Sequence, residues 1–148
     1  MSRRGFAILT AAVAIAGCGG PAVPAPTPVE GVVLLNGQPL PNAQVMFTPT
    51  APGLPAGAVA SATTDDAGRF VLTTGGKTGA VPGEHLVTVA EGPVPEELRG
   101  EQDQEKAAKA RAGLKNRPIP PRYGTATKSD LRVTVTKDQK EYKVELTR

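Results

Sequence analysis

Side chains that commonly carry out covalent or metal chemistry are scarce in this chain. Its 148 residues include one histidine, His85, and one cysteine, Cys18. One histidine cannot serve both a catalytic triad and a metal site, and no histidine, cysteine and carboxylate side chains cluster at metal-ligand spacing. The sequence therefore predicts no catalytic residues, no metal and no cofactor. His85 lies within an apolar stretch, and we interpret it as a packed or rim residue with a satisfied ring nitrogen.

Two adjacent carboxylates, Asp65 and Asp66, are the best-placed pair of acids. Such oxygens can bind calcium. A hairpin turn is the favoured interpretation, because an aspartate accepts hydrogen bonds from nearby backbone N–H groups and Gly68 adopts a positive φ easily. The glycine-rich segment 73–83 lacks the spacing of a phosphate-binding loop and no helix follows it, so we interpret it as a flexible loop.

Cys18 stands at the end of a short hydrophobic segment near the N-terminus. Arg3 and Arg4 precede the apolar residues 6–16, which are far too few to span a bilayer. A basic start followed by a short apolar run is typical of an export signal. We therefore expect residues 1–17 to be a signal peptide that is removed after export.

The residues that end this segment, Ile15-Ala16-Gly17-Cys18, resemble the lipobox of bacterial lipoproteins. The resemblance implies that the Cys18 thiol carries a diacylglycerol, that the chain is cleaved just before it, and that the new amino terminus is acylated. The alternative is that Cys18 is an ordinary small apolar residue. In lipoproteins an aspartate after the cysteine favours the inner membrane, so Gly19 favours the periplasmic face of the outer membrane.

We expect residues 18–29 to consist of the lipidated cysteine and a tether that is rich in proline and alanine. Segment 19–28 contains four prolines and no charged residue, a composition that favours an extended polyproline II conformation. It cannot build a hydrophobic core, so we place the folded domain at 30–148. The stretch Ser-Arg-Arg-Gly-Phe resembles a twin-arginine export signal, and this route stays open beside general secretion.

From residue 30 onward, short apolar runs rich in β-branched residues are separated by turn residues, which is typical of strands. The last two runs alternate most clearly, and we expect them to form a closing hairpin across the polar turn 137–140. Asn36 and Gly37 predict another hairpin turn because both tolerate positive φ. Seven strands favour an all-β, antiparallel β-sandwich. The predicted strands are 30–36, 43–49, 58–64, 69–74, 84–90, 130–136 and 141–147.

Three motifs in this region resemble the carboxypeptidase regulatory-like, transthyretin-like domain. They are GVVLLNGQPLPNAQVMFTP at 31–49, TTDDAGRFVLT at 63–73 and GAVPGEHLVTV at 79–89. The last motif has His85 where that family has tyrosine. The resemblance implies a Greek-key sandwich of about seven strands. The HExxH motif of the peptidases that carry this domain is absent, which argues against peptidase activity.

Glutamate, lysine, alanine, glutamine and arginine dominate the segment 91–117 and favour helix. Leu98 and Leu114 are its only large aliphatic residues away from its start, too few for a buried face. We expect a helical excursion or a disordered loop rather than a packed helix. A partner-binding helix is the alternative.

The charge balance bears on the class of partner. Removal of residues 1–17 leaves 15 basic residues against 14 acidic ones. The remaining lysines and arginines are spread along the chain, so they do not form the basic surface that nucleic acid requires. The sequence therefore predicts no nucleic-acid partner.

Aromatic side chains bear on carbohydrate binding, which uses exposed rings as stacking platforms. The chain has five aromatic residues and no tryptophan. Only Tyr123, beside Arg122, lies in a loop, where it either contacts a partner or caps one end of the sandwich. We therefore predict a non-catalytic, exported protein, lipid-anchored to a membrane of the cell envelope, that binds or supports another envelope protein. A module for a cell-wall polymer or carbohydrate is the alternative, and an enzyme with an unrecognised site is a further one.

Overall fold

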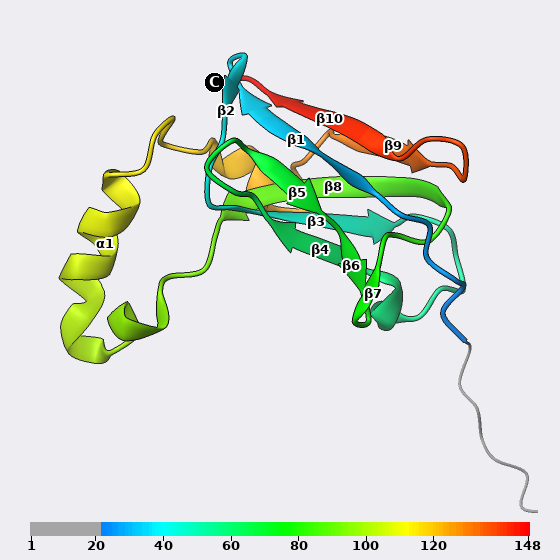
Figure 1. The fold of residues 1–148 in the computed structure, drawn as a ribbon, viewed down its shortest axis with the longest axis horizontal. Helices are drawn as coiled ribbons and strands as arrows, with labels where there is room; N and C mark the ends of the chain where they lie inside the picture. The colour runs from blue at the N-terminus through cyan, green and yellow to red at the C-terminus, as the bar shows by residue number, and fades with distance from the viewer. Residues whose placement is uncertain (1–21) are drawn as a thin grey trace, which may run out of the picture.

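The computed structural model describes residues 22–148. The predicted signal segment, including the lipobox residues Ile15, Ala16 and Gly17, lies outside the described residues, and so does Cys18. Figure 1 shows strands arranged in two facing sheets, with one α-helix beside them. The strands are β1 (Glu30–Leu35), β2 (Gln38–Pro39), β3 (Ala43–Pro49), β4 (Ala60–Thr63), β5 (Arg69–Val71), β6 (Thr73–Thr74), β7 (Lys77–Thr78), β8 (Gly83–Glu91), β9 (Arg132–Val135) and β10 (Glu141–Leu146). The helices are α1 (Gln104–Ala112) and the 3₁₀ helices Ala56–Ala58, Glu96–Leu98, Glu101–Asp103 and Pro121–Gly124.

Two sheets make up the body of the protein. One has the strand order β10-β1-β2, with β5 also paired to β1. The other has the order β7-β6-β4-β3-β8-β9. All pairings are antiparallel except that of β1 with β10, which is parallel. The described chain is therefore an all-β body of two sheets, as the sequence predicts at this level.

The core lies between the sheets because each long strand is apolar on one face. Val45 and Phe47 of β3 are fully buried, and Val144 and Leu146 of β10 are nearly so, while the residues between them are exposed. Phe47 meets Phe70 of the opposite sheet with a centroid distance of 6.1 Å and tilted rings. Such tilted aromatic contacts add to the free energy gained from burial.

The run predicted as one strand at 69–74 is two strands. β5 pairs with β1 in one sheet, whereas β6 pairs with β4 in the other. Leu72, between them, is buried and donates its backbone N–H to the Val29 carbonyl over 2.9 Å. The chain thus crosses between the sheets at Leu72. The prediction missed the two-residue strands β2 and β7, which are too short for a periodic pattern.

The predicted closing hairpin of the last two strands is wrong. β9 pairs with β8, and β10 pairs with β1 in the other sheet. Alternation identified the buried face of each strand. The buried face of β9 and that of β10, however, lie on opposite sides of one shared core. The Tyr142 hydroxyl joins the two strands by accepting from the Thr136 backbone N–H and donating to the Gln139 carbonyl, both over 3.1 Å.

The predicted turn at Asn36 and Gly37 is confirmed. These residues connect β1 to β2 with φ values of 51° and 77°. Two consecutive positive φ values are those of a type I′ hairpin turn, whose twist matches the flanking strands.

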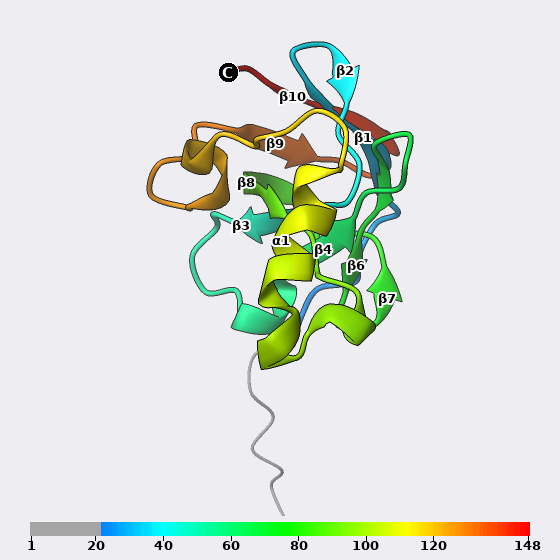
Figure 2. The same cartoon turned by 90° about the vertical axis from the view of Figure 1, so that its left-hand side faces the viewer.

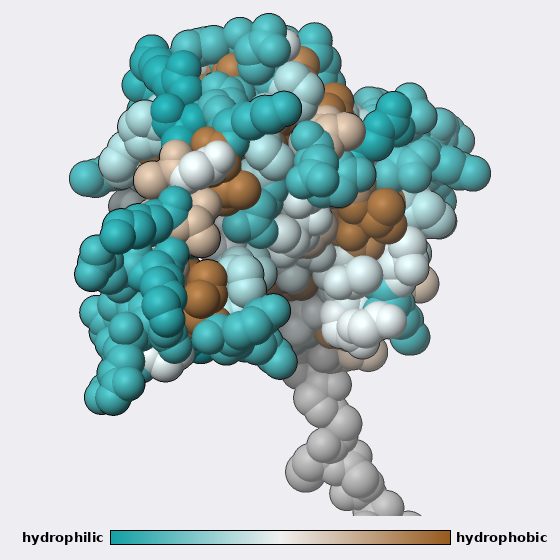
Figure 3. All heavy atoms as spheres, turned by 60° about the vertical axis from the view of Figure 1, so that its left-hand side comes forward, coloured by the Kyte–Doolittle hydropathy of each residue, from teal (hydrophilic) through white to brown (hydrophobic). Residues whose placement is uncertain are grey.

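Helix α1 occupies the middle of the segment 91–117. Of the two expected states, a helical excursion and a disordered loop, the helical excursion is confirmed. Ala107 is its only buried residue. Two ion pairs lie along it, Lys106 with Asp103 and Lys109 with Glu105. Figures 1 and 2 show the helix outside both sheets, and Figure 3 shows a mainly hydrophilic face with small, separate hydrophobic groups on this side. The helix has no apolar face with which to pack onto the sandwich.

The packed part of the chain begins before β1. Thr27 exchanges backbone hydrogen bonds of 2.8 and 2.9 Å with Ala80, and the Val29 side chain is buried in the core. The last residues of the proline-rich segment therefore belong to the folded body. Within residues 22–148, no helix is both long enough and apolar enough to cross a bilayer.

Candidate functional site

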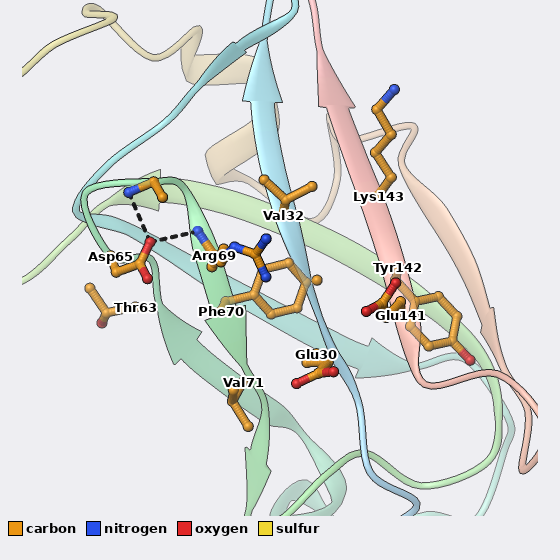
Figure 4. A pocket seen from close by; sticks show the side chains of 12 residues that line it. Glu30, Val32, Thr63, Asp65, Arg69, Phe70, Val71, Glu141, Tyr142 and Lys143 are labelled. Atoms are coloured by element: carbon orange, nitrogen blue, oxygen red, sulfur yellow. Dashed lines mark hydrogen bonds between the residues drawn. The ribbon is translucent and has the colours of Figure 1, made fainter.

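A hollow of about 930 Å³ lies over the outer face of β5, β1 and β10 (Figure 4). Thr63 of β4 and the turn residues Asp65 and Ala67 also line it. The six strand residues at its centre are Glu30, Val32, Arg69, Val71, Glu141 and Lys143. Because side chains alternate along a strand, Phe70 and Tyr142, which lie between these residues on β5 and β10, point inward and are buried.

Strand register sorts the six side chains into two rows. Glu30 lies opposite Val71 on β5 and Glu141 on β10, and we call these three residues the acidic row. The next outward residue of β1, Val32, lies opposite Arg69 and Lys143, and we call these three the basic row. In the acidic row the two carboxylates are therefore side by side, whereas in the basic row Val32 separates Arg69 from Lys143. Opposite charges lie in the two rows.

Gly31 permits this close arrangement of three strands. A Cβ at Gly31 would overlap the Tyr142 carbonyl oxygen and lie 2.8 Å from Cζ of the Phe70 ring. No side chain larger than hydrogen fits there without moving β10 or the ring. The glycine thus keeps β5, β1 and β10 in the register that forms the rows.

The charges of the hollow are only partly neutralised by each other. Lys143 Nζ lies 2.8 Å from Glu145 Oε1, but both side chains are more than half exposed, so this ion pair is weak. None of the ion pairs within residues 22–148 includes Arg69, Glu30 or Glu141. Val71, opposite Glu30 at the β5 end of the acidic row, is 52% exposed. The hollow offers a guanidinium, two carboxylates and an apolar contact to a ligand.

The aspartate pair lies at one wall of the hollow and forms a turn. Asp65 Oδ1 accepts the backbone N–H groups of Ala67 and Arg69, both over 2.9 Å, and Gly68 has a φ of 73°. The interpretation of Asp65 as a turn residue is therefore confirmed. Throughout residues 22–148, no group of three or more potential metal-ligating side chains comes together.

His85 is fully buried in β8, so the expectation of a packed position is confirmed. The expectation of a satisfied ring holds for one nitrogen only. Nδ1 lies 2.9 Å from the Gly83 carbonyl, whereas Nε2 is buried with no hydrogen-bond partner. The ring packs against Phe47 with a centroid distance of 5.9 Å. Burial lowers the pKa of His85 below 6.5, and the Gly83 hydrogen bond offsets this only in part.

The lowered pKa of His85 predicts a pH-dependent stability. Below pH 6.5 the unfolded chain takes up a proton that folded His85 resists, so the free energy of unfolding falls as the pH falls through this window. The limiting slope for one proton is about 1.4 kcal/mol per pH unit. Urea unfolding between pH 7.5 and 5.5 measures it. We expect His85→Phe to remove this part of the slope, and an equal slope in both proteins would contradict the assignment.

Tyr123 caps one end of the sandwich and is only 4% exposed. Its hydroxyl accepts the Thr147 backbone N–H over 3.1 Å and an Arg122 Nη2 hydrogen bond over 2.9 Å. The Arg122 guanidinium also lies 4.7 Å from the ring centroid. Burial alone would raise the pKa of Tyr123, but the bonds from Thr147 and Arg122 outweigh it and lower the pKa. Of the two interpretations, the cap fits, and an outward-facing Tyr123 ring does not.

All four aromatic residues of the described chain, Phe47, Phe70, Tyr123 and Tyr142, are buried. Residues 22–148 therefore present no exposed aromatic platform on which a sugar ring would stack.

Sequence reasoning missed the hollow. Glu30, Arg69, Glu141 and Lys143 each look like ordinary solvent-exposed strand positions, and the only local signal was their alternation with apolar residues. The pairing of β1 with β10 joins residues 111 positions apart in the chain, such as Glu30 and Glu141. That pairing is set by the tertiary structure.

No family model, no curated protein and no solved structure matches this chain. Among residues 22–148, the charged hollow over β5, β1 and β10 is the surface that best suits a ligand.

Proposed function

We propose that this chain is a non-catalytic, lipid-anchored protein of the bacterial cell envelope whose β-sandwich binds another envelope protein. The observation that carries the proposal is the hollow, with its exposed Val71 and with Arg69, Glu30 and Glu141 outside the described ion pairs. Arginine and apolar side chains suit a protein-binding surface. Charged groups around them favour a partner of complementary charge.

The anchoring half of the proposal is supported by the sequence. A basic start, a short apolar run and the lipobox-like Ile15-Ala16-Gly17-Cys18 imply lipid attachment at Cys18. Thr27 joins the folded body just before β1 begins, so the proline-rich segment meets the sandwich at the start of β1 (Figure 1). The acidic row of the hollow starts at Glu30, close to this junction.

We further propose that the sandwich is a transthyretin-like Greek-key domain. In support, the motif at 31–49 covers β1, the following turn and β3, and the motif at 63–73 covers the turn before β5. The motif at 79–89 covers most of β8. The three motifs thus coincide with strands and turns of the two sheets.

Cross-linking in intact cells tests the binding function. The full-length protein carries an affinity tag at its C-terminus, and mass spectrometry identifies every protein that is covalently joined to it. We expect one reproducible envelope protein linked through the sandwich. Recovery of abundant envelope proteins alone, or retention of the protein on purified cell wall, would contradict the proposal and favour a structural or wall-binding role.

A further inference from the structure

We propose that the hollow over β5, β1 and β10 binds an extended peptide segment that carries one acidic and one basic side chain two residues apart. This inference rests on the proposed function, that the sandwich binds another protein, and names the chemistry of the recognised segment.

The spacing of the two rows carries the argument. Glu30 and Val32 are successive outward residues of β1, so the rows are separated by two residues along the strand, about 6.6 Å. An extended peptide has the same period, and its side chains at i and i+2 face the same way. A peptide that lies along β1 therefore sets a basic side chain over Glu30 and Glu141 while its acidic side chain reaches Arg69.

Each row suits a group of opposite charge. Glu30 and Glu141 are directly opposite each other in register, and their like charges repel unless a cation lies between them. In the basic row Val32 separates Arg69 on β5 from Lys143 on β10, and each of these cations suits an acidic side chain. The exposed ion pair of Lys143 with Glu145 gives way to a ligand at small cost.

Shape and apolar surface favour a peptide over a free amino acid. The hollow holds about 930 Å³ and is bounded on one side by Thr63 and the turn at Asp65. The ammonium and carboxylate of a free amino acid sit on one carbon, too close together to reach both rows. Val71, 52% exposed, supplies the apolar contact that a peptide side chain or backbone covers.

Two labelled peptides test the spacing on the full-length protein in detergent micelles. Both are fluorescein-labelled decapeptides of serine and threonine with one glutamate and one lysine. In the first peptide the two charges are at i and i+2, and in the second they are adjacent, which places them on opposite faces of an extended chain. By fluorescence anisotropy we expect the first to bind about tenfold more tightly, because the second satisfies only one row at a time. Equal affinity would overturn the proposal.

Charge variants test the residues. Arg69→Glu and Glu30→Lys are each expected to weaken binding of the first peptide about tenfold. Lys128→Glu, an exposed residue outside the hollow, makes the same charge change as Arg69→Glu and is expected to have no effect.

The outcome separates this inference from the proposed function. If cross-linking recovers the same envelope protein with wild type and with Arg69→Glu, the domain binds a protein but the hollow is not its site. If no reproducible partner is recovered, the proposed function itself fails. Unchanged peptide binding by both single variants would also overturn the inference.

Discussion

Replacing Gly79 with alanine is expected to destabilise the fold by about 3 kcal/mol or more. Gly79 has a φ of 112°, a conformation that residues with a Cβ rarely adopt. A Cβ there would overlap the Thr27 carbonyl oxygen and lie 2.9 Å from the Pro28 nitrogen. Backbone atoms cannot rotate away as a side chain can, so the segment before β1 must detach or β7 must move.

The measurement is urea unfolding of the purified protein, followed by circular dichroism. Gly76→Ala is the matched control, because Gly76 lies in the same glycine-rich segment, has a φ of 81° and has open space around its Cα. It bears only the backbone cost, about 1 kcal/mol. Equal losses in the two variants would show that contact with Thr27 contributes nothing.

Gly79 also lies next to the contact that holds the proline-rich segment against the sandwich. The bridge between Thr27 and Ala80 joins the last residues of the proline-rich segment to the turn after β7. We therefore expect Gly79→Ala also to expose the segment 22–29 to proteases while the strands remain folded at low temperature.

Replacing Cys18 with serine is expected to abolish membrane anchoring. Each CH₂ group buried in lipid contributes about 0.8 kcal/mol, and stable anchoring requires more than one acyl chain. In the proposed lipoprotein, no diacylglycerol attaches without the thiol, so the domain loses the acyl chains that would hold it. After cell fractionation we expect the wild type in the membrane pellet and the released domain of Cys18→Ser in the soluble fraction.

Intact mass spectrometry and one control variant complete this experiment. The wild-type protein is expected to begin at residue 18 and to carry the added mass of its lipid. Gly20→Ser changes the same segment but keeps Cys18, and it is expected to remain in the pellet. A Cys18→Ser protein that still pellets with the mass of the chain cut before residue 18 would contradict lipidation.

The sequence predicts most of the strands because their signal is local. In β10, Tyr142, Val144 and Leu146 are apolar and buried, while the charged residues between them are exposed. Alternation of this kind reports which face of a strand leaves water, and it depends only on a few neighbouring residues. For the same reason the turn at Asn36 and Gly37 was predictable, since positive φ is a property of those residue types.

The partner of each strand is not local, and here prediction failed. The turn 137–140 looks like a hairpin tip, yet β9 and β10 belong to different sheets. Two strands that each have one apolar face and are joined by a short polar turn show the same alternation in either arrangement. They can pair within one sheet or face each other across a core. The choice depends on β1 and β8, which lie far away in the chain.

By itself, the sequence determined the all-β class, the positions of the main strands, the helix-favouring composition of 91–117 and the expectation of a lipid anchor at Cys18. Only the tertiary structure decided that Nε2 of His85 is buried without a partner and that Arg69 and Lys143 flank Val32 beside the carboxylates of Glu30 and Glu141. The reason is physical: conformation and burial pattern follow from neighbours along the chain, whereas contacts between charges follow from the register of strands that meet only when the whole core forms.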